Sequence, residues 1–162
     1  MDTPNIPTPL DLLNENVKPE WIDYNGHMNV AYYLLAFDEA SETLDAYLGL
    51  SREYKKRTNK GTFAGDIHIS YIREVKEGDP LRMTGRVVGS DAKRVHYWLE
   101  MYHATEGYLA ATAEYMILHI DMSVRRVAPM APDMVEWIAQ VRDAHATLGI
   151  PTGLGKIMKV PA

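Results

Sequence analysis

The spacing of apolar residues predicts one long helix in the first third of the chain. Between residues 29 and 48, small and apolar side chains recur at steps of three and four, as expected for a helix that buries one face. These residues are Val30, Tyr33, Leu34, Phe37, Ala40, Ser41, Leu44, Tyr47 and Leu48. Asn29 is suited to cap the first turn and Gly49 to end the helix, so we expect the boundaries there.

The pattern changes to a period of two after this helix. In residues 61–75, apolar residues such as Phe63, Ile67 and Ile69 alternate with polar ones, which indicates a strand with one buried face. Three further strands are predicted at residues 80–89, 93–105 and 108–122. The connections between them are short and contain turn-forming residues, so consecutive strands should be antiparallel neighbours.

The two ends of the chain carry weaker patterns. Residues 15–21 are predicted to form a short first strand and residues 132–147 a final helix. Three prolines in the first ten residues disfavour regular structure, so we expect residues 1–13 to be an unfolded or surface-draped lead. Residues 14–147 would then form a single domain, and residues 148–162 an irregular tail.

This order of elements predicts an α+β fold. A single long helix must bury its apolar stripe against one face of the sheet. We therefore expect a five-stranded antiparallel sheet that wraps around the long central helix, with an additional helix near the C-terminus.

Composition narrows the classes of function and partner. The formal net charge is −5, which does not favour binding to nucleic acid. The longest apolar run, residues 31–37, is too short to cross a membrane, and the N-terminus does not resemble a signal peptide. The absence of cysteine excludes disulfides and thiolate chemistry. We expect a cytoplasmic protein with neither nucleic-acid nor membrane partners.

Other familiar chemical signatures are missing from the sequence. The six histidines show no pair at helical spacing with an acidic third ligand beside it, so we expect no metal site. Lysine and arginine do cluster in residues 51–61, around Arg57. This segment is either a solvated loop or a local site for the phosphate groups of a substrate.

The segment directly before the long helix concentrates polar side chains: Asp23, Asn25 and His27. Backbone N–H groups at a helix N-terminus are free to polarise a carbonyl oxygen, and a nearby carboxylate can activate water or attack the carbonyl itself. This combination suits hydrolysis of an activated acyl group. The alternative is structural, with Asp23 and Asn25 capping a turn and His27 satisfied at a surface or interface.

The stretch WIDYNGHMNVAYYLLAFDEAS resembles the signature of the hotdog-fold acyl-CoA thioesterases, in which Asp, His, Asn and Tyr recur at fixed spacing before and within a long helix. The matching residues here are Asp23, His27, Met28, Asn29 and Tyr33. The resemblance implies a hotdog fold, a homodimer or homotetramer with sites at the subunit interface, and hydrolysis of acyl-CoA without a metal or redox cofactor. It also implies that Asp23 is the general base or nucleophile.

Further roles follow from the same resemblance. Asn25 would orient water or the carboxylate, and His27 would anchor the turn or assist catalysis as a polar partner. Arg57 would contact the phosphates of CoA. Backbone amides from Met28 to Val30 would polarise the thioester carbonyl.

Plant acyl-ACP thioesterases share a fuller Asp-x-Asn-x-His pattern and a later Tyr-x-Arg-Glu. In this sequence the later pattern matches Tyr71, Arg73 and Glu74, which implies a catalytic role for Glu74. The cysteine that follows this Glu in those enzymes is replaced by Val75. The 4-hydroxybenzoyl-CoA thioesterases have two more residues in the turn, so either Asp23 or Asn25 occupies their catalytic position. Because an amide cannot act as a base, we expect Asp23 to be the catalytic residue.

Over the whole chain the sequence is similar to the betainyl-CoA thioesterases of carnitine breakdown, for example in HISYIREVKEGDPL and ATAEYMILHID. This similarity makes betainyl-CoA a candidate substrate. An acidic residue also precedes the His-Ile pair in that group, and here it is Asp66, two positions before His68. Both should lie on one face of a strand, either as a pocket wall opposite Asp23 or as a solvated edge. The expected substrate-binding residues are Met28, Asn29, Val30, Tyr33, Asp66, His68 and Arg57.

Two other functions are compatible with the same fold. One is a hydratase or dehydratase, which would carry a His with an Asp or Glu at other positions. The other is a non-catalytic acyl-CoA-binding module, which would need a regulatory attachment for which 162 residues leave no space.

Overall fold

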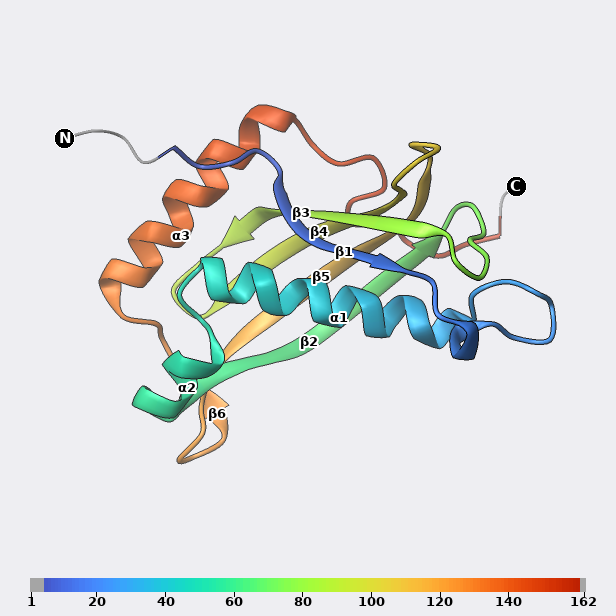
Figure 1. The fold of residues 1–162 in the computed structure, drawn as a ribbon. Coiled ribbons are helices and arrows are strands. Elements are labelled where there is room, and N and C mark those ends of the chain that lie inside the picture. Colours follow the sequence, from blue (N-terminus) through green and yellow to red (C-terminus); the bar gives the residue numbers. More distant parts are fainter. Residues whose placement is uncertain (1–4, 161–162) are drawn as a thin grey trace.

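The computed structural model describes residues 5–160 and shows a curled antiparallel sheet that holds one long helix in its hollow (Figure 1). Its elements are β1 (Leu10–Asn16), the 3-10 turn η1 (Pro19–Trp21), α1 (Val30–Tyr47), α2 (Arg52–Thr58), β2 (Lys60–Tyr71), β3 (Pro80–Ser90), β4 (Arg94–His103), β5 (Leu109–Asp121), β6 (Arg126–Val127), α3 (Pro132–His145) and η2 (Ala146–Leu148). The expected α+β hotdog architecture, including the C-terminal helix, is confirmed.

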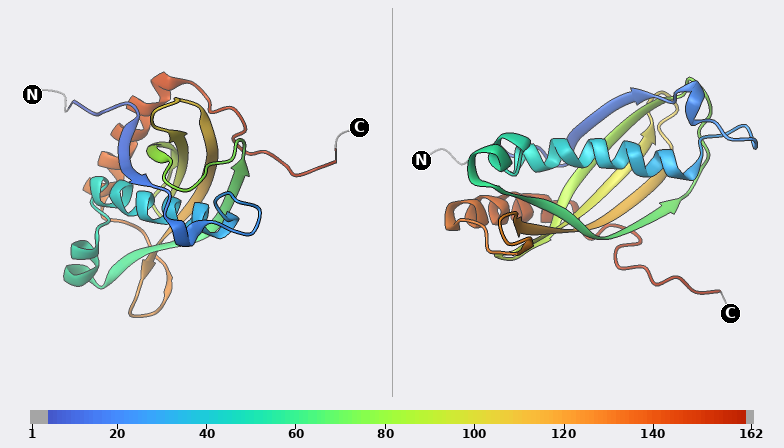
Figure 2. Two further views of the ribbon diagram at one scale, coloured as in Figure 1. Left: turned by 45° about the vertical axis from the view of Figure 1, so that its right-hand side comes forward. Right: turned by 90° about the horizontal axis from the view of Figure 1, so that it is seen from below.

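The strands of the sheet follow the order β1-β3-β4-β5-β2, and every pair is antiparallel. The short strand β6 adds to β5 outside this path. Strand β2 is paired only with β5, so among residues 5–160 its other edge is free. Two further views show α1 running along the hollow of the sheet and α3 outside it (Figure 2).

Helix α1 begins and ends where the sequence predicts. The side-chain oxygen of Asn29 accepts a hydrogen bond of 3.0 Å from the N–H of Ala31 and caps the first turn. Gly49 follows the helix with φ of +86°, which glycine adopts without strain. Phe37 and Leu44 are fully buried against the sheet, and each such side chain stabilises the fold by roughly 2 kcal/mol.

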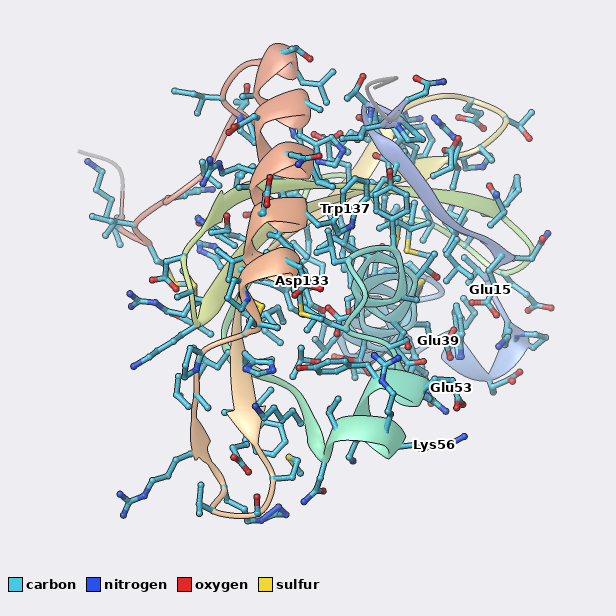
Figure 3. All side chains as sticks on the ribbon, turned by 90° about the vertical axis from the view of Figure 1, so that its left-hand side faces the viewer. Glu15, Glu39, Glu53, Lys56, Asp133 and Trp137 are labelled. Carbon is cyan, nitrogen blue, oxygen red and sulfur yellow. The ribbon has the colours of Figure 1, made fainter. Side chains whose placement is uncertain are left out.

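Helix α3 packs against the C-terminal end of α1. Its residues Ile138 and Val141 are fully buried. The indole N–H of Trp137 donates to the carbonyl of Tyr47, the last residue of α1, across 3.2 Å, and the two aromatic rings have centroids 5.7 Å apart (Figure 3). These contacts fix the position of the C-terminal helix relative to the central one.

Part of the predicted apolar stripe of α1 is not buried in this chain. Val30 is 55% exposed and Leu34 is 41% exposed, although both fit the helical spacing of the core residues. They lie at the edge of the buried face. An exposed apolar strip beside a buried one is typical of a surface that packs against another protein.

The first strand lies earlier than predicted. Strand β1 covers Leu10–Asn16 and pairs with β3, so residues 10–13 belong to the sheet and not to a draped lead. Within it, Leu10 and Leu12 are buried while Asp11 is exposed, which is the alternation of a half-buried strand. Pro19 begins a 3-10 turn in place of the expected continuation to residue 21. Residues 1–4 of the expected lead and 161–162 of the expected tail lie outside the described part.

The basic segment at residues 51–61 is not a loop throughout, because it contains helix α2. The hydroxyl of Ser51 accepts a hydrogen bond of 3.3 Å from the N–H of Tyr54 and caps this helix. The phenol of Tyr54 is buried and lies 3.0 Å from Nε2 of His119 on β5. This buried contact fixes a short helix that its charged composition alone does not reveal.

No helix within residues 5–160 is long and apolar enough to span a bilayer.

Candidate active site

The segment that contains Asp23 and His27 forms a tight loop at the start of α1. Ile22 and Met28 form an antiparallel bridge, and the N–H of Asp23 donates to the carbonyl of His27 across 3.1 Å. Gly26 turns the chain with φ of +79°. Met28 is fully buried, so the base of the loop is anchored in the core. The loop therefore folds back on itself directly before the first turn of the helix (Figure 1).

One oxygen of the Asp23 carboxylate accepts a hydrogen bond, and the other has no recorded partner in the described part of the chain. Oδ1 accepts a hydrogen bond of 2.8 Å from the backbone N–H of Asn25, whereas Oδ2 has no recorded partner within residues 5–160. The side chain of Asn25 is exposed and makes no recorded bond in the same range, so its backbone orients the carboxylate and its amide does not. The half-buried ring of His27 has Nδ1 3.2 Å from the carbonyl of Met28, consistent with anchoring the loop.

Only one of the three backbone amides expected to polarise a carbonyl is available. The N–H of Met28 donates to the carbonyl of Val75 at 2.9 Å, and that of Asn29 donates to Trp21 at 2.8 Å. The N–H of Val30 has no recorded acceptor in the described chain. It belongs to the first residue of α1, where the helix dipole favours negative charge. Of the three amides, this one therefore remains free to donate within the described chain.

A group of tyrosines borders the same end of α1. The hydroxyl of Tyr71 donates to the carbonyl of Val30 at 3.3 Å. The ring of Tyr33 meets the ring of Tyr71 nearly at right angles, with centroids 5.1 Å apart. Tyr33 is buried, and this burial is the main cause that raises its pKa to about 12, with the neighbouring groups Tyr108 and Glu74 adding to it.

Glu74 contacts Tyr108 near these tyrosines, and its implied catalytic role stays a prediction. Its backbone carbonyl accepts a hydrogen bond of 3.0 Å from the hydroxyl of Tyr108. Its carboxylate is 56% exposed and lies 3.7 Å from the ammonium of Lys76. Tyr108 was not singled out in the sequence, because only the pairing of distant strands brings it here.

Arg57 does not lie at this site within one chain. It belongs to α2, which follows the C-terminal end of α1, whereas Asp23 precedes the N-terminal end (Figure 1). The 18 residues of α1 separate the two by about 27 Å at 1.5 Å per residue.

Asp66 and His68 lie on the face of the sheet that points away from α1. Both line a cavity of about 240 Å³ on that outer face, together with His96 and Glu114. Nε2 of His96 is 2.7 Å from a carboxylate oxygen of Glu114 there. The prediction that Asp66 and His68 share a face is confirmed. The idea that they form a wall opposite Asp23 in the same chain is wrong, because Ile67 between them packs against the core.

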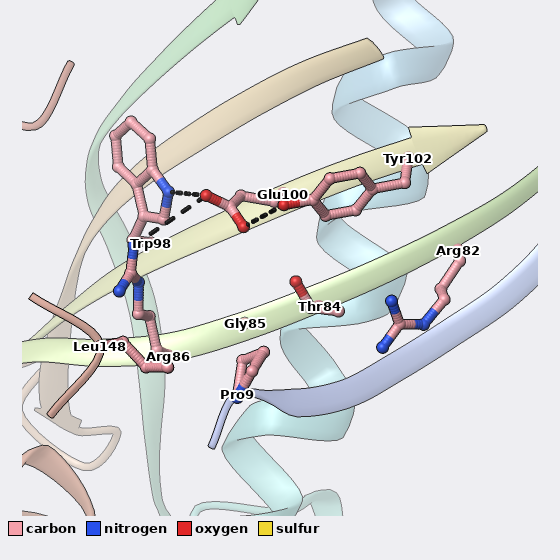
Figure 4. A pocket seen from close by; sticks show the side chains of 9 residues that line it. All are labelled: Pro9, Arg82, Thr84, Gly85, Arg86, Trp98, Glu100, Tyr102 and Leu148. Carbon is pink, nitrogen blue, oxygen red and sulfur yellow. Dashed lines mark hydrogen bonds and ion pairs between the residues drawn. The ribbon is translucent and has the colours of Figure 1, made fainter. Parts of the chain in front are cut away.

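A second cavity on the outer face, of about 320 Å³, is lined by two arginines and two aromatic rings (Figure 4). Its central carboxylate, Glu100, accepts hydrogen bonds from Trp98 Nε1 at 3.0 Å and from the hydroxyl of Tyr102 at 2.7 Å. Arg86 lies 4.0 Å from Glu100, and Arg82 pairs with Asp11. The charged side chains of this cavity are thus paired with one another or with Asp11.

A half-buried carboxylate at the far end of α1, that of Asp45, was not singled out in the sequence. Asp45 accepts hydrogen bonds from the hydroxyls of Tyr97 and Thr62, and it lines a cavity of about 350 Å³. Burial raises the pKa of this carboxyl to about 6, against the opposing effect of the two hydrogen bonds. No group of three or more metal-ligating side chains occurs in the part of the chain that the structure covers.

The family model of the thioesterase-like superfamily matches residues 17–138. The chain is 33% identical to the betainyl-CoA thioesterase of Pseudomonas aeruginosa, over 90% of this chain and 91% of that protein. Among solved structures, the hypothetical protein SAV2348 from Staphylococcus aureus in complex with CoA superimposes with a TM-score of 0.86 at 26% identity, over 98% of this chain and 100% of that one. A putative thioesterase from Pseudomonas putida KT2440 gives a TM-score of 0.80 at 30% identity, over 95% and 98% of the two chains.

Proposed function

Because the chain belongs to the thioesterase-like superfamily, we propose that it hydrolyses the thioester of a small acyl-CoA, with betainyl-CoA as the substrate. The observation that carries this proposal is the position of Asp23 in the loop that leads directly into α1. One oxygen of its carboxylate has no recorded partner in the described chain, and neither does the N–H of Val30, the first residue of the helix. The similarity over nine tenths of the chain to a betainyl-CoA thioesterase supports the choice of acyl group.

The proposed reaction uses these two groups in sequence. The carboxylate of Asp23 takes a proton from water as the water oxygen attacks the thioester carbonyl. The developing oxyanion accepts a hydrogen bond from the N–H of Val30. When the carbonyl re-forms, the carbon–sulfur bond breaks and CoA leaves as the thiolate, which takes up the proton held by Asp23.

Direct attack by Asp23 is the second route. The carboxylate would displace the CoA thiolate and form a mixed anhydride, and water would then hydrolyse that intermediate. A single turnover in ¹⁸O-water separates the routes, because only attack by Asp23 can carry label into the protein carboxylate.

The proposal requires no metal or redox cofactor, since a thioester is already activated and a thiolate is a good leaving group. Turnover should therefore be unchanged after dialysis against EDTA. We retain the expectations of a cytoplasmic protein with neither nucleic-acid nor membrane partners as part of the proposal.

We also propose that the active unit is a homodimer, or a homotetramer built from it, formed along the free edge of β2. Val30 and Leu34 on α1 and Ile72 after β2 expose apolar surface. The hydrogen bond from Tyr71, the last residue of β2, to the carbonyl of Val30 places the start of α1 beside the end of this strand. A two-fold axis would pair β2 with its copy in antiparallel fashion. Strand β2 runs from α2 towards Tyr71. The pairing would therefore bring α2, with Arg57 of the partner subunit, towards the Asp23 end, where Arg57 could meet CoA phosphates.

The test is release of free CoA from a panel of acyl-CoA thioesters, followed with a thiol reagent. The chain has no cysteine, so the protein gives no background signal. We expect turnover of betainyl-CoA to exceed that of neutral short-chain and aromatic thioesters. Binding without release would instead favour a non-catalytic acyl-CoA module. Conversion of an enoyl-CoA without thiol release would favour a hydratase.

A further inference from the structure

We propose that Tyr71 and Glu74 recognise the positive charge of the acyl group, with the ring of Tyr71 and the carboxylate of Glu74 on two sides of a quaternary ammonium. This inference rests on the proposed function and adds the residues that determine its specificity. It assigns Glu74 to substrate recognition, whereas the motif comparison implied catalysis.

The ring of Tyr71 is held in place and is also accessible. Its hydroxyl is fixed by the carbonyl of Val30 at 3.3 Å, and its ring is braced at right angles by the buried ring of Tyr33. Even so, 51% of Tyr71 is exposed. A fixed, exposed aromatic face attracts a quaternary ammonium through the ring quadrupole, and it loses little side-chain entropy when the cation binds.

The position of Tyr71 suits a short acyl group. In a betainyl thioester one methylene separates the carbonyl carbon from the nitrogen, so the two atoms are roughly 2.5 Å apart at ordinary bond lengths. A site for the ammonium must therefore adjoin the oxyanion donor. The same residue, Val30, supplies the available N–H and the carbonyl that fixes Tyr71.

Glu74 supplies negative charge three residues after Tyr71, and the carbonyl of the next residue, Val75, accepts a hydrogen bond of 2.9 Å from the N–H of Met28 just before α1. Hydrogen bonding of its backbone carbonyl to Tyr108 fixes the segment, while its carboxylate remains 56% exposed. The carboxylate has one recorded ion pair, a loose contact of 3.7 Å with Lys76. An ammonium that displaces solvent between Tyr71 and Glu74 would gain both a ring face and a counter-charge.

The nearby positive charges are occupied elsewhere. The guanidinium of Arg73 lies 3.8 Å from the centroid of Tyr108 and 3.7 Å from the carboxylate of Glu106. Arg73 therefore covers the ring of Tyr108, and the ring of Tyr71 has no recorded cation over it within residues 5–160. Lys76 shares the carboxylate of Glu74 and is 66% exposed, so it can swing away into solvent.

The experiment compares betainyl-CoA with 3,3-dimethylbutanoyl-CoA, which has the same shape but carries carbon in place of the charged nitrogen. The measured quantity is the ratio of the two kcat/KM values. We expect Tyr71→Leu to lower this ratio by roughly 10-fold, the scale of a partly desolvated cation–π contact. Tyr71→Phe keeps the ring face and should retain most of the ratio.

Glu74→Gln tests the counter-charge, with Glu77→Gln as its matched control. Glu77 is an exposed carboxylate in the same hairpin and has no recorded ion pair in the described chain. We expect Glu74→Gln to reduce the ratio several-fold through a higher KM for the cation, and Glu77→Gln to leave it unchanged. A catalytic Glu74 would instead lower kcat for both substrates equally.

The outcomes separate this inference from the proposed function. If the wild-type protein releases CoA from neither substrate, both fail. If it hydrolyses the neutral thioester without preferring the cationic one, hydrolysis stands and charge recognition is overturned. Charge recognition by these residues is also overturned if betainyl-CoA is preferred but folded Tyr71→Leu and Glu74→Gln proteins keep the wild-type ratio. Circular dichroism establishes that each variant is folded.

Discussion

The carboxylate of Asp23 accepts a hydrogen bond of 2.8 Å from the backbone N–H of Asn25 through one oxygen only. Asp23 therefore does what a turn-capping residue does while keeping a second oxygen free. The structural and chemical interpretations of this motif do not exclude each other. The cap fixes the direction of the carboxylate, and a fixed direction is what a general base needs.

The cap of α1 should contribute to both stability and activity. Asn29→Ala removes the hydrogen bond to the N–H of Ala31 and should lower the free energy of unfolding by about 1 kcal/mol. It should also lower kcat, because the first turn that presents the N–H of Val30 becomes less ordered. Urea unfolding and CoA release measure the two effects.

Ser51→Ala provides the matched control, since Ser51 caps α2 in the same manner. A similar loss of stability is expected, with little change in kcat. Equal losses of activity in both variants would show that the effect on catalysis is a general consequence of instability.

Asp45 should make stability depend on pH in an unusual direction. Its pKa is about 6 in the folded protein and 3.8 as the reference value, so the folded state holds a proton that the unfolded state has lost. The protonated form stabilises the fold at low pH, and this contribution is lost as pH rises from about 4 through 6.

Asp45→Asn should therefore be more stable than the wild type at pH 8, by about 3 kcal/mol, and the difference should shrink towards pH 4. The amide oxygen can accept from Tyr97, and the amide N–H₂ can donate to the hydroxyl of Thr62. Urea unfolding of both proteins across this range is the measurement. A difference that is constant with pH would contradict the raised pKa.

The proposed dimer predicts that charge on the exposed flank of α1 is disruptive. Leu34→Glu should dissociate the protein and lower activity at low protein concentration, as judged by light scattering and dilution assays. Leu148→Glu is the control, because Leu148 is equally exposed, at 41%, but lies after α3. An unchanged oligomer in Leu34→Glu, or a monomeric wild type with full activity, would rule out this interface.

Periodicity predicted the long helix and the four long strands because each buries one regular face in the core. Periodicity could not show which apolar residues at the side of α1 are buried, because Leu34 fits the same spacing as Phe37 yet remains exposed. Helix α2 was not predicted from the sequence, because its segment is mostly charged and has one buried residue, Tyr54. The hydrogen-bonding partner of Tyr54, His119, lies 65 residues away along the chain.

The faces of β2 show a further limit of sequence patterns. Phe63 and Ile67 have the same parity, and the alternation predicts one face for both. A register shift between Ala64 and Asp66 reverses the alternation, so Phe63 is 44% exposed while Ile67 packs against the core. The motif predicted a site at Asp23, and this stays a prediction. Tyr33 and Tyr71 were also named by the motif comparison, but Tyr108 was not, because only tertiary packing brings its hydroxyl to the carbonyl of Glu74.

The most direct test of the central claim is the turnover of betainyl-CoA by Asp23→Asn. Asparagine retains an oxygen that can accept the N–H of Asn25, so the loop and the melting temperature should be preserved. The free carboxylate oxygen is lost, and we predict that kcat falls by roughly 10²–10⁴-fold. A folded Asp23→Asn protein that turns over within threefold of the wild type would contradict the claim and leave Asp23 as a turn cap alone.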